Sequence, residues 1–164
     1  MKITFGKQKH LPEIVGIFND YIANSNARFE TELMTLENKQ HWFEQFQPDS
    51  RYQLFVAVEK QTVLGFACSH SYRALAAFNE TVEVSIYLTS SVKGRGVGSA
   101  LYQRLFDALS SQNVHSALSG IALPNEASIA LHKKFGFCEV GIFREYARKN
   151  DQYISSIWLE KLFK

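Results

Sequence analysis

The chain has 164 residues, of which 46% are hydrophobic and 21% charged, and its formal net charge is +2. This composition predicts a single globular domain, 1–164, with a sizeable core, and it excludes a disordered chain. The small net charge gives no indication of nucleic-acid binding, and the apolar runs are too short to span a membrane. No long apolar stretch follows Met1, so we expect no signal peptide and a cytoplasmic protein.

The first third of the chain predicts one short strand and two helices. A strand at 2–5 precedes a helix at 11–23, where apolar residues recur at helical spacing. A polar loop at 24–35 leads to a second helix, which begins with the capping sequence Thr35–Asn38 and is ended by Pro48.

The rest of the chain alternates strands with helices. Strands are expected at 54–58 and 63–69, and the polar residues between them predict a hairpin turn. The later elements are a strand at 81–88, a helix at 97–110, a strand at 117–123, a helix at 128–135 ended by Gly136, and strands at 137–146 and 153–162. This order predicts an α/β or α+β fold with six or seven strands flanked by helices.

Two cysteines, Cys68 and Cys138, lie in apolar runs that look like strands. The sequence has no CxxC motif and no histidine pair near either cysteine, so we expect no metal site. We predict that both are buried, reduced thiols.

A glycine-rich turn between the strand at 81–88 and the next helix is the most informative stretch. Glycines let the backbone approach an anion closely, and the first N–H groups of a helix have no partner within it. The helix dipole favours negative charge at the same place. We therefore predict a phosphate site built from Lys93, Gly94, Arg95, Gly96, Val97, Gly98 and Ser99.

Three phosphate ligands compete for this turn. A mononucleotide P-loop requires GxxxxGK[ST], which is absent. A dinucleotide fold requires GxGxxG and an acidic residue at the end of the next strand, whereas this chain has GxGxG and that strand ends in Pro124-Asn125. The third ligand is the pyrophosphate of coenzyme A, which suits the spacing and the position of the turn in mid-chain.

The turn resembles the [Q/R]xxGx[G/A] motif of the Gcn5-related N-acetyltransferase (GNAT) superfamily, with Lys93 in place of the usual Gln or Arg. A second segment is similar to the stretch that packs beside the pantetheine arm in that superfamily; it comprises Asn125, Ser128, Leu131, Gly136 and Phe137. Both segments occur in family order and at family spacing. The resemblance implies a mixed, mostly antiparallel sheet with about four helices, whose strands splay at the coenzyme A site.

Other segments resemble the branch of this superfamily that acetylates phosphinothricin and methionine sulfoximine. They are Asn19–Ile22, Phe29–Glu32, Glu83–Leu88 and Leu123–Asn125, and the resemblance extends from residue 3 to residue 162. The branch often has an acid two residues after an aromatic near the C-terminus, where this chain has Tyr153-Ile154-Ser155. That departure bears on the substrate rather than on the fold or cofactor. The branch also implies a homodimer.

Glu83 matches the catalytic glutamate of the branch. An alkyl ammonium with a pKa of roughly 10 must lose a proton before it attacks a thioester, so a base is needed. Glu83 shares a strand face with Ser85 and Tyr87, which leaves open a glutamate that simply lies on a polar face. A backbone N–H near Tyr87 or Leu88 is expected to stabilise the oxyanion.

The resemblance places Asn125, Ser128 and His132 beside acetyl-CoA, although His132 also fits a structural role in its helix. The acceptor pocket is expected to use side chains from the first loop and from the segment before Glu83. They are Phe29, Glu30, Tyr72, Arg73, Phe78 and Ser85. Arg73 fits either a carboxylate ligand or a surface position.

We therefore predict a metal-free, acetyl-CoA-dependent N-acetyltransferase that acts on the primary amine of a small molecule, such as an amino acid or its analogue. Neither cysteine has a base beside it, so direct attack in a ternary complex is expected. Acetylation of a protein N-terminus or a polyamine remains an alternative, the latter because of Glu30 and Glu32. A non-catalytic acyl-CoA sensor is another. We expect no nucleic-acid or membrane partner.

Overall fold

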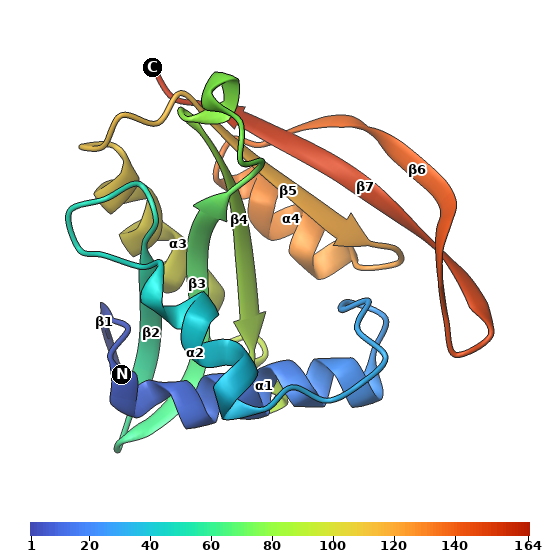
Figure 1. Ribbon diagram of the computed structural model, residues 1–164, viewed down its shortest axis with the longest axis horizontal. Coiled ribbons are helices and arrows are strands. Elements are labelled where there is room, and N and C mark those ends of the chain that lie inside the picture. Colours follow the sequence, from blue (N-terminus) through green and yellow to red (C-terminus); the bar gives the residue numbers. More distant parts are fainter.

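Seven strands form one continuous sheet in the computed structural model, which describes residues 1–164 (Figure 1). The strand order is β1-β2-β3-β4-β5-β7-β6, and every neighbouring pair is antiparallel except β4 and β5. The strands are β1 (Lys2–Phe5), β2 (Leu54–Glu59), β3 (Thr62–Ser71), β4 (Thr81–Leu88), β5 (Ser116–Ala122), β6 (Cys138–Lys149) and β7 (Gln152–Leu162). The predicted mixed, mostly antiparallel sheet is confirmed.

Four α-helices accompany the sheet, as predicted. They are α1 (Leu11–Asn24), α2 (Leu36–Glu44), α3 (Val97–Leu109) and α4 (Glu126–Lys134). The last helix begins two residues earlier than expected because the Asn125 side chain caps it, accepting a 3.2 Å hydrogen bond from the Ser128 N–H. No helix has both the length and the apolar character needed to cross a membrane.

The helices cover both faces of the sheet (Figure 1). On one face α1 buries Ile14 and Phe18, and the Phe18 ring packs edge-on against Phe66 of β3 at 5.0 Å. On the other face α3 buries Leu101 and Leu105 in a core shared with β2, β3 and β4. Each such side chain contributes about 1.5–3 kcal/mol by leaving water. The spacing that predicted these helices is thus the spacing of their buried faces.

The parallel pair β4 and β5 is joined over only three residues of each strand. Thr81–Glu83 pair with Ser116–Leu118, and the remainder of β4 has no strand partner on that side. The two strands diverge beyond this point, so the predicted splay is confirmed. A strand edge that lacks a partner leaves backbone N–H and C=O groups free to bind a ligand.

The last two strands form a long hairpin at one edge of the sheet, and its turn end lies near the end of α1 (Figure 1). Its turn is Asn150-Asp151, with φ values of 52° and 57°, so the strands continue further than the predicted ends at 146 and 153. Cys138 begins β6 and is exposed, which corrects the prediction that both cysteines are buried. The apolar run around Cys138 lies on the outermost strand, where no layer covers it. Cys68 is buried as predicted.

Candidate active site

The divergence of β4 and β5 opens a cleft of about 470 Å³, a typical size for a small-molecule site. Its walls come from the end of α1, from β4 and β5, and from α4. The predicted site residues that line it are Ser85, Tyr87, Leu88, Lys93, Asn125, Ser128 and His132. The fold therefore brings two segments that are distant in the sequence to one cleft.

The glycine-rich turn leads into α3 through left-handed backbone that favours glycine. Gly94 has a φ of 74° and Gly96 a φ of 76°. The first bond of the helix joins the Ala100 N–H to the Gly96 carbonyl oxygen (3.0 Å), so the amides of Val97–Ser99 have no acceptor within the helix. The Arg95 amide donates within the preceding turn (3.2 Å). The expected cradle of free amides therefore begins after Arg95.

The two cations of this turn point to different places. Lys93 lines the cleft. One guanidinium nitrogen of Arg95 lies 2.9 and 3.1 Å from the two carboxylate oxygens of Glu59 on β2. This pairing lowers the pKa of the Glu59 carboxyl. Of the two side chains expected to meet a phosphate, Lys93 is the one that faces the cleft.

The backbone of β4 faces the cleft where its pairing with β5 stops. The Tyr21 hydroxyl donates to the Leu88 carbonyl oxygen (2.9 Å) and accepts a hydrogen bond from the Leu88 N–H (3.4 Å). Both backbone groups of Leu88 thus point toward the cleft. The N–H and C=O of Ile86 point the same way, because the backbone groups of alternate residues in a strand lie on the same side. Sequence reasoning missed Tyr21, whose one signal was its place in the Asn19–Ile22 segment.

Helix α4 presents a histidine whose nitrogens are both used inside the protein. His132 is 2% exposed, its Nδ1 lies 2.7 Å from the Ser128 carbonyl oxygen, and its Nε2 lies 2.8 Å from the Tyr102 hydroxyl. A carbonyl only accepts, so Nδ1 carries the proton and Nε2 accepts from Tyr102. Burial lowers the pKa of the imidazole. These contacts favour the structural alternative for His132, which joins α4 to α3. Nothing in the sequence indicated that Tyr102 would be its partner.

Glu83 lies at the fork of the sheet. It is the last residue of β4 that pairs with β5, opposite Leu118, and it pairs with His70 across β3 and β4. Burial raises the pKa of the Glu83 carboxyl, against the opposing effects of His70 and Arg28. A carboxylate with a raised pKa is a better proton acceptor than an exposed one. Ser85, on the same strand face, lines the cleft.

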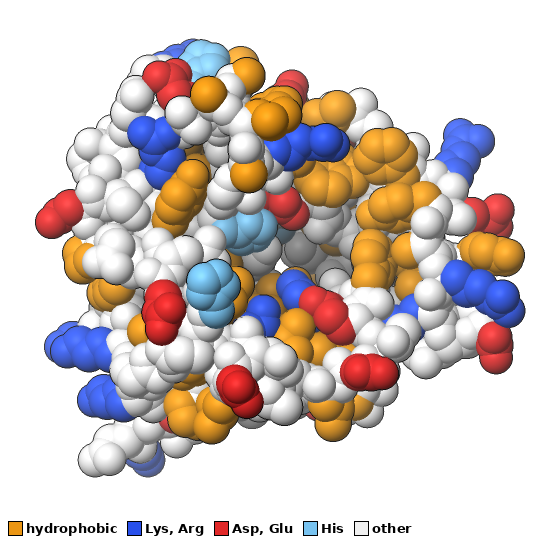
Figure 2. Space-filling view, viewed as in Figure 1, with side chains coloured by type: hydrophobic (Ala, Val, Ile, Leu, Met, Phe, Trp, Pro, Cys, Tyr) orange, Lys and Arg blue, Asp and Glu red, His pale blue; other side chains and the backbone are white.

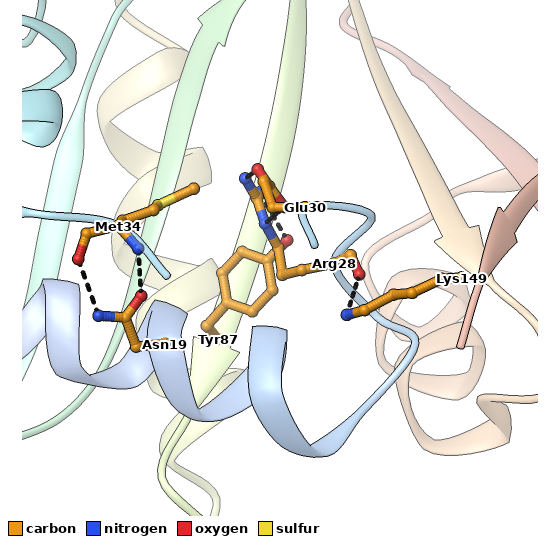
Figure 3. Close-up of polar contacts among 6 residues, drawn as sticks. All are labelled: Asn19, Arg28, Glu30, Met34, Tyr87 and Lys149. Atoms are coloured by element: carbon orange, nitrogen blue, oxygen red, sulfur yellow. Dashed lines mark hydrogen bonds and ion pairs between the residues drawn. The ribbon is translucent and has the colours of Figure 1, made fainter. Parts of the chain in front are cut away.

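The loop between α1 and α2 carries an ion pair beside β4. Arg28 pairs with Glu30, donates to the Tyr87 hydroxyl (3.2 Å) and lies over the Phe18 ring at 4.8 Å (Figure 3). Burial raises the pKa of the Glu30 carboxyl, but the hydrogen bond and charge of Arg28 outweigh it and lower that pKa overall. Glu30, predicted to bind substrate, is thus neutralised by Arg28, which sequence reasoning missed.

Four other predicted acceptor residues lie outside the lining of the cleft. Phe29 is 39% exposed and packs edge-on against Tyr146 of β6 at 5.8 Å. Tyr72 packs against Phe78 at 5.4 Å, and the exposed Arg73 lies over the Tyr72 ring at 5.3 Å. None of the four contributes to the wall between β4 and β5.

Trp158 of β7 lies between Tyr72, in the segment before β4, and Gly120, which lines the cleft. Its ring lies 6.5 Å from the Tyr72 ring, centroid to centroid. It also covers Gly120, where a Cβ atom would stand 2.7 Å from the indole. Because Gly120 lines the cleft, a larger residue there would displace Trp158 or narrow the cleft.

The loop between α1 and α2 is fixed at both ends (Figure 3). Near its start the Lys149 ammonium of the β6–β7 hairpin donates to the carbonyl oxygens of Ile22, Ser25 and Arg28, at 2.7, 2.9 and 2.8 Å. Near its end the Asn19 amide of α1 exchanges two hydrogen bonds with the Met34 backbone, at 2.9 and 2.8 Å. These contacts hold the segment that carries Arg28 and Glu30.

Residues 3–158 match the acetyltransferase (GNAT) domain family. The chain belongs to the GNAT acetyltransferase family. A phosphinothricin N-acetyltransferase from Streptomyces coelicolor is 40% identical to this GNAT chain over 163 residues, which cover 98% of this chain and 95% of that one. An L-methionine sulfoximine/L-methionine sulfone acetyltransferase from Pseudomonas aeruginosa is 30% identical over 151 residues, with coverages of 92% and 87%.

A solved structure has the same fold and contains the acetyl donor. A protein from Salmonella typhimurium, solved with its cofactor acetyl-CoA, matches this GNAT acetyltransferase with a TM-score of 0.94 at 26% identity. The match covers 100% of this chain and 94% of that one. The residues here fit such a donor, because Val97–Ser99 offer free amides, Lys93 offers a cation and β4 offers an unpaired backbone edge.

Proposed function

We propose that this GNAT acetyltransferase transfers the acetyl group of acetyl-CoA to the primary amine of an amino acid or a close analogue, such as phosphinothricin or methionine sulfoximine. The observation that carries the proposal is the position of Glu83 at the fork between β4 and β5. Glu83 itself is not part of the cleft lining, but it directly precedes Val84 and Ser85, which are. The names of the two relatives support the choice of acceptor.

The donor half of the site rests mainly on backbone groups. In this proposal the amides of Val97–Ser99 and the Lys93 ammonium bind the pyrophosphate. Asn125 and Ser128, together with the free edge of β4, hold the pantetheine arm. The Leu88 N–H is directed at the thioester oxygen, where negative charge develops during transfer. In the structure this N–H donates to the Tyr21 hydroxyl (3.4 Å), so in our proposal the thioester oxygen replaces that hydroxyl as its acceptor.

The acceptor half supplies a base and no nucleophile. Glu83 takes a proton from the ammonium, and the amine attacks the thioester carbonyl while the carbon–sulfur bond breaks. A covalent acyl-enzyme is disfavoured at Cys68, because burial raises the pKa of its thiol to about 12. His132 has no free N–H for the departing thiolate, since its proton is held by Ser128. Solvent therefore protonates the sulfur in our proposal.

We also infer that the protein is a homodimer. The β6–β7 hairpin exposes a set of large apolar side chains that a partner copy would cover: Val140, Ile142, Phe143, Tyr146 and Tyr153. Light scattering on the purified protein measures the mass directly. A monomer at micromolar concentration would contradict this inference.

A thiol-release assay tests the function. Purified protein and acetyl-CoA are incubated with phosphinothricin, methionine sulfoximine, ordinary amino acids, a polyamine and a short peptide with a free N-terminus. We expect turnover with the amino-acid analogues and little with the polyamine, because Arg28 neutralises Glu30. Preferential turnover of the peptide or polyamine would replace the proposed acceptor. Binding of acetyl-CoA without turnover of any amine would favour a sensor.

A further inference from the structure

The protein buries two lysine side chains, and their surroundings differ completely. Lys149 is 4% exposed and its ammonium donates to three backbone carbonyls. Lys39, on α2, is 8% exposed and its ammonium makes no hydrogen bond. It lies instead over the rings of Phe18 (4.3 Å) and Trp42 (4.6 Å). Cation–π contacts of this kind offset only part of the cost of burying a charge.

The Lys39 ammonium remains open to solvent. Trp158 Nε1 is the one side-chain polar atom that is both sealed from solvent and without a partner. The Lys39 nitrogen, which also lacks a partner, is therefore not sealed. The side chain is mostly buried, its nitrogen keeps some contact with solvent, and no protein group accepts a hydrogen bond from it.

The charges around Lys39 leave it without a counter-ion. Arg28 is close enough to lower the pKa of the Lys39 ammonium, but burial is the larger cause, and together they bring the value to about 8. Glu30, the carboxylate that raises the pKa of Lys39, is already paired with Arg28. Arg28 and Glu30 thus form an ion pair, whereas the Lys39 ammonium has no ion-pair partner in the protein.

This charge belongs to the acceptor side of the site. The Lys39 ammonium and the Arg28 guanidinium both lie over the Phe18 ring, and that ring packs against Tyr87 of β4 at 5.3 Å. Glu83 lies on the same face of β4 as Tyr87, because side chains alternate along a strand. Figure 2 shows this face, with a hollow near its centre around which basic, acidic and histidine side chains gather. Lys39 comes from α2, whereas Glu83 comes from β4 at the fork.

We propose that Lys39 binds an oxyanion group of the acceptor, a carboxylate or a phosphinate on the same molecule as the reacting amine. Such a group supplies the missing counter-ion and accepts the free donors of the ammonium. The amine then lies toward Glu83 while the anion lies toward α2. This inference rests on the proposed function and names the chemistry that an acceptor needs besides its amine.

Steady-state kinetics with matched acceptors test the role of Lys39. The wild-type protein, Lys39→Gln, Lys39→Arg and the exposed-site control Lys164→Gln are assayed with phosphinothricin, with its carboxamide, with methionine sulfoximine and with methionine sulfoximine methyl ester. In Lys39→Gln we expect the KM for the anionic acceptors to rise about tenfold or more, with little change in kcat or in the KM for acetyl-CoA.

For each variant, the acid is compared with its own ester or carboxamide, and the result is the preference for the acid. Lys39→Gln is expected to lose its preference for acid over ester, whereas Lys39→Arg and Lys164→Gln keep theirs. If the preference is lost with both acids, the bound group is the carboxylate. If Lys39→Gln weakens phosphinothricin and its carboxamide equally and leaves methionine sulfoximine unchanged, the bound group is the phosphinate, which both phosphinothricin compounds retain. An equal effect of Lys39→Gln on methionine sulfoximine and its methyl ester, or no effect on any acceptor, would overturn the proposal.

A binding measurement separates this inference from the proposed function. Glutarate has two carboxylates and no amine, so it cannot be acetylated. Calorimetry of glutarate with the acetyl-CoA-bound protein is expected to show weaker binding for Lys39→Gln than for Lys164→Gln. That difference supports the inference even if no amine in the panel is turned over. Equal glutarate binding by the two variants would contradict it.

Discussion

Lys149 and Arg28 are 121 residues apart in the sequence, yet the Lys149 ammonium donates a 2.8 Å hydrogen bond to the Arg28 carbonyl oxygen. The same ammonium donates to Ile22 and Ser25, so the last hairpin of the chain fixes the end of α1 and the loop after it. A side chain in that hairpin therefore influences the position of the acceptor residues without touching the acceptor.

Replacing Lys149 by Met is expected to weaken acceptor binding. The change leaves three carbonyl groups without their charged donor and costs about 2–4 kcal/mol of folding stability. We expect a lower Tm and a raised KM for the amine acceptor, with the KM for acetyl-CoA unchanged. Lys149→Arg, which retains the charge, should restore part of both effects. Arg148→Met, at the exposed neighbouring position, is the control; a rise in the KM for acetyl-CoA would contradict the prediction.

Glu83→Gln is expected to lower kcat about 100-fold by removing the base, with no change in acetyl-CoA affinity. Because the pKa of Glu83 is raised and only its ionised form accepts a proton, wild-type activity should increase with pH through a midpoint above 4.5. The variant should lose this acid limb. Glu160→Gln, an exposed glutamate on β7, is the control. A pH–rate profile that survives in Glu83→Gln would assign the base to another group.

The two cations of the glycine-rich turn are expected to differ in their effect on the donor. Lys93→Ala should raise the Kd of acetyl-CoA about tenfold, because Lys93 faces the cleft. Arg95→Ala should change that Kd little, since its guanidinium is paired with Glu59. Calorimetric titration with acetyl-CoA measures both. A larger loss in Arg95→Ala would mean that Arg95 leaves Glu59 when the donor binds.

Gly96→Ala is expected to weaken acetyl-CoA binding and to cost about 1–2 kcal/mol of stability. Gly96 has a φ of 76° at the start of α3, and a side chain disfavours that conformation. The matched control is Gly16→Ala, in the middle of α1, where nothing lies within 4 Å of the added Cβ. There alanine should stabilise the helix by about 0.5–1 kcal/mol. Chemical denaturation gives both values, and equal effects at the two positions would contradict the argument.

Acceptor binding is expected to weaken as the pH rises through about 8, where Lys39 loses its charge. The groups that act on Lys39 are Arg28, Glu30 and Cys68. Its folded-state pKa lies below the unfolded value of 10.5, so the unfolded chain binds the proton more tightly. Folding stability should therefore rise with pH between about 8 and 10.5 from this residue, while the affinity for an anionic acceptor falls. Lys39→Arg should remove both trends, and their persistence in that variant would exclude Lys39 as their source.

The fold and the donor half of the site could be predicted because both are local in the sequence. Helical spacing of apolar residues gave α1 and α3, and the glycine spacing gave the turn before α3. The same local pattern was wrong for Cys138, because an apolar run does not show that β6 is the outermost strand. Local patterns also could not decide between a cofactor-binding and a structural role for His132, because its partner Tyr102 lies on another helix.

The acceptor half was harder to predict because its contacts join distant segments. Arg28 meets Tyr87 across 59 residues, and Lys149 reaches Ile22 across 127. The periodicity of apolar residues does not predict contacts between such distant residues. A lysine in a polar hairpin ordinarily indicates a solvated surface. The buried position of Lys39 had no sequence signal either, because it follows the capping segment of a helix that is mostly exposed.

Because β4 pairs with β5 over a short length only, the main chain is available to the donor, and recognition of the acceptor is left to side chains. In the proposed site the donor contacts mainly peptide groups beyond Glu83, and these stay the same when residues mutate. The proposed acceptor contacts are Arg28, Lys39 and the aromatic side chains around them, which a single codon change can alter. Proteins with this fold can therefore change the amine that they accept while they keep the binding site for acetyl-CoA.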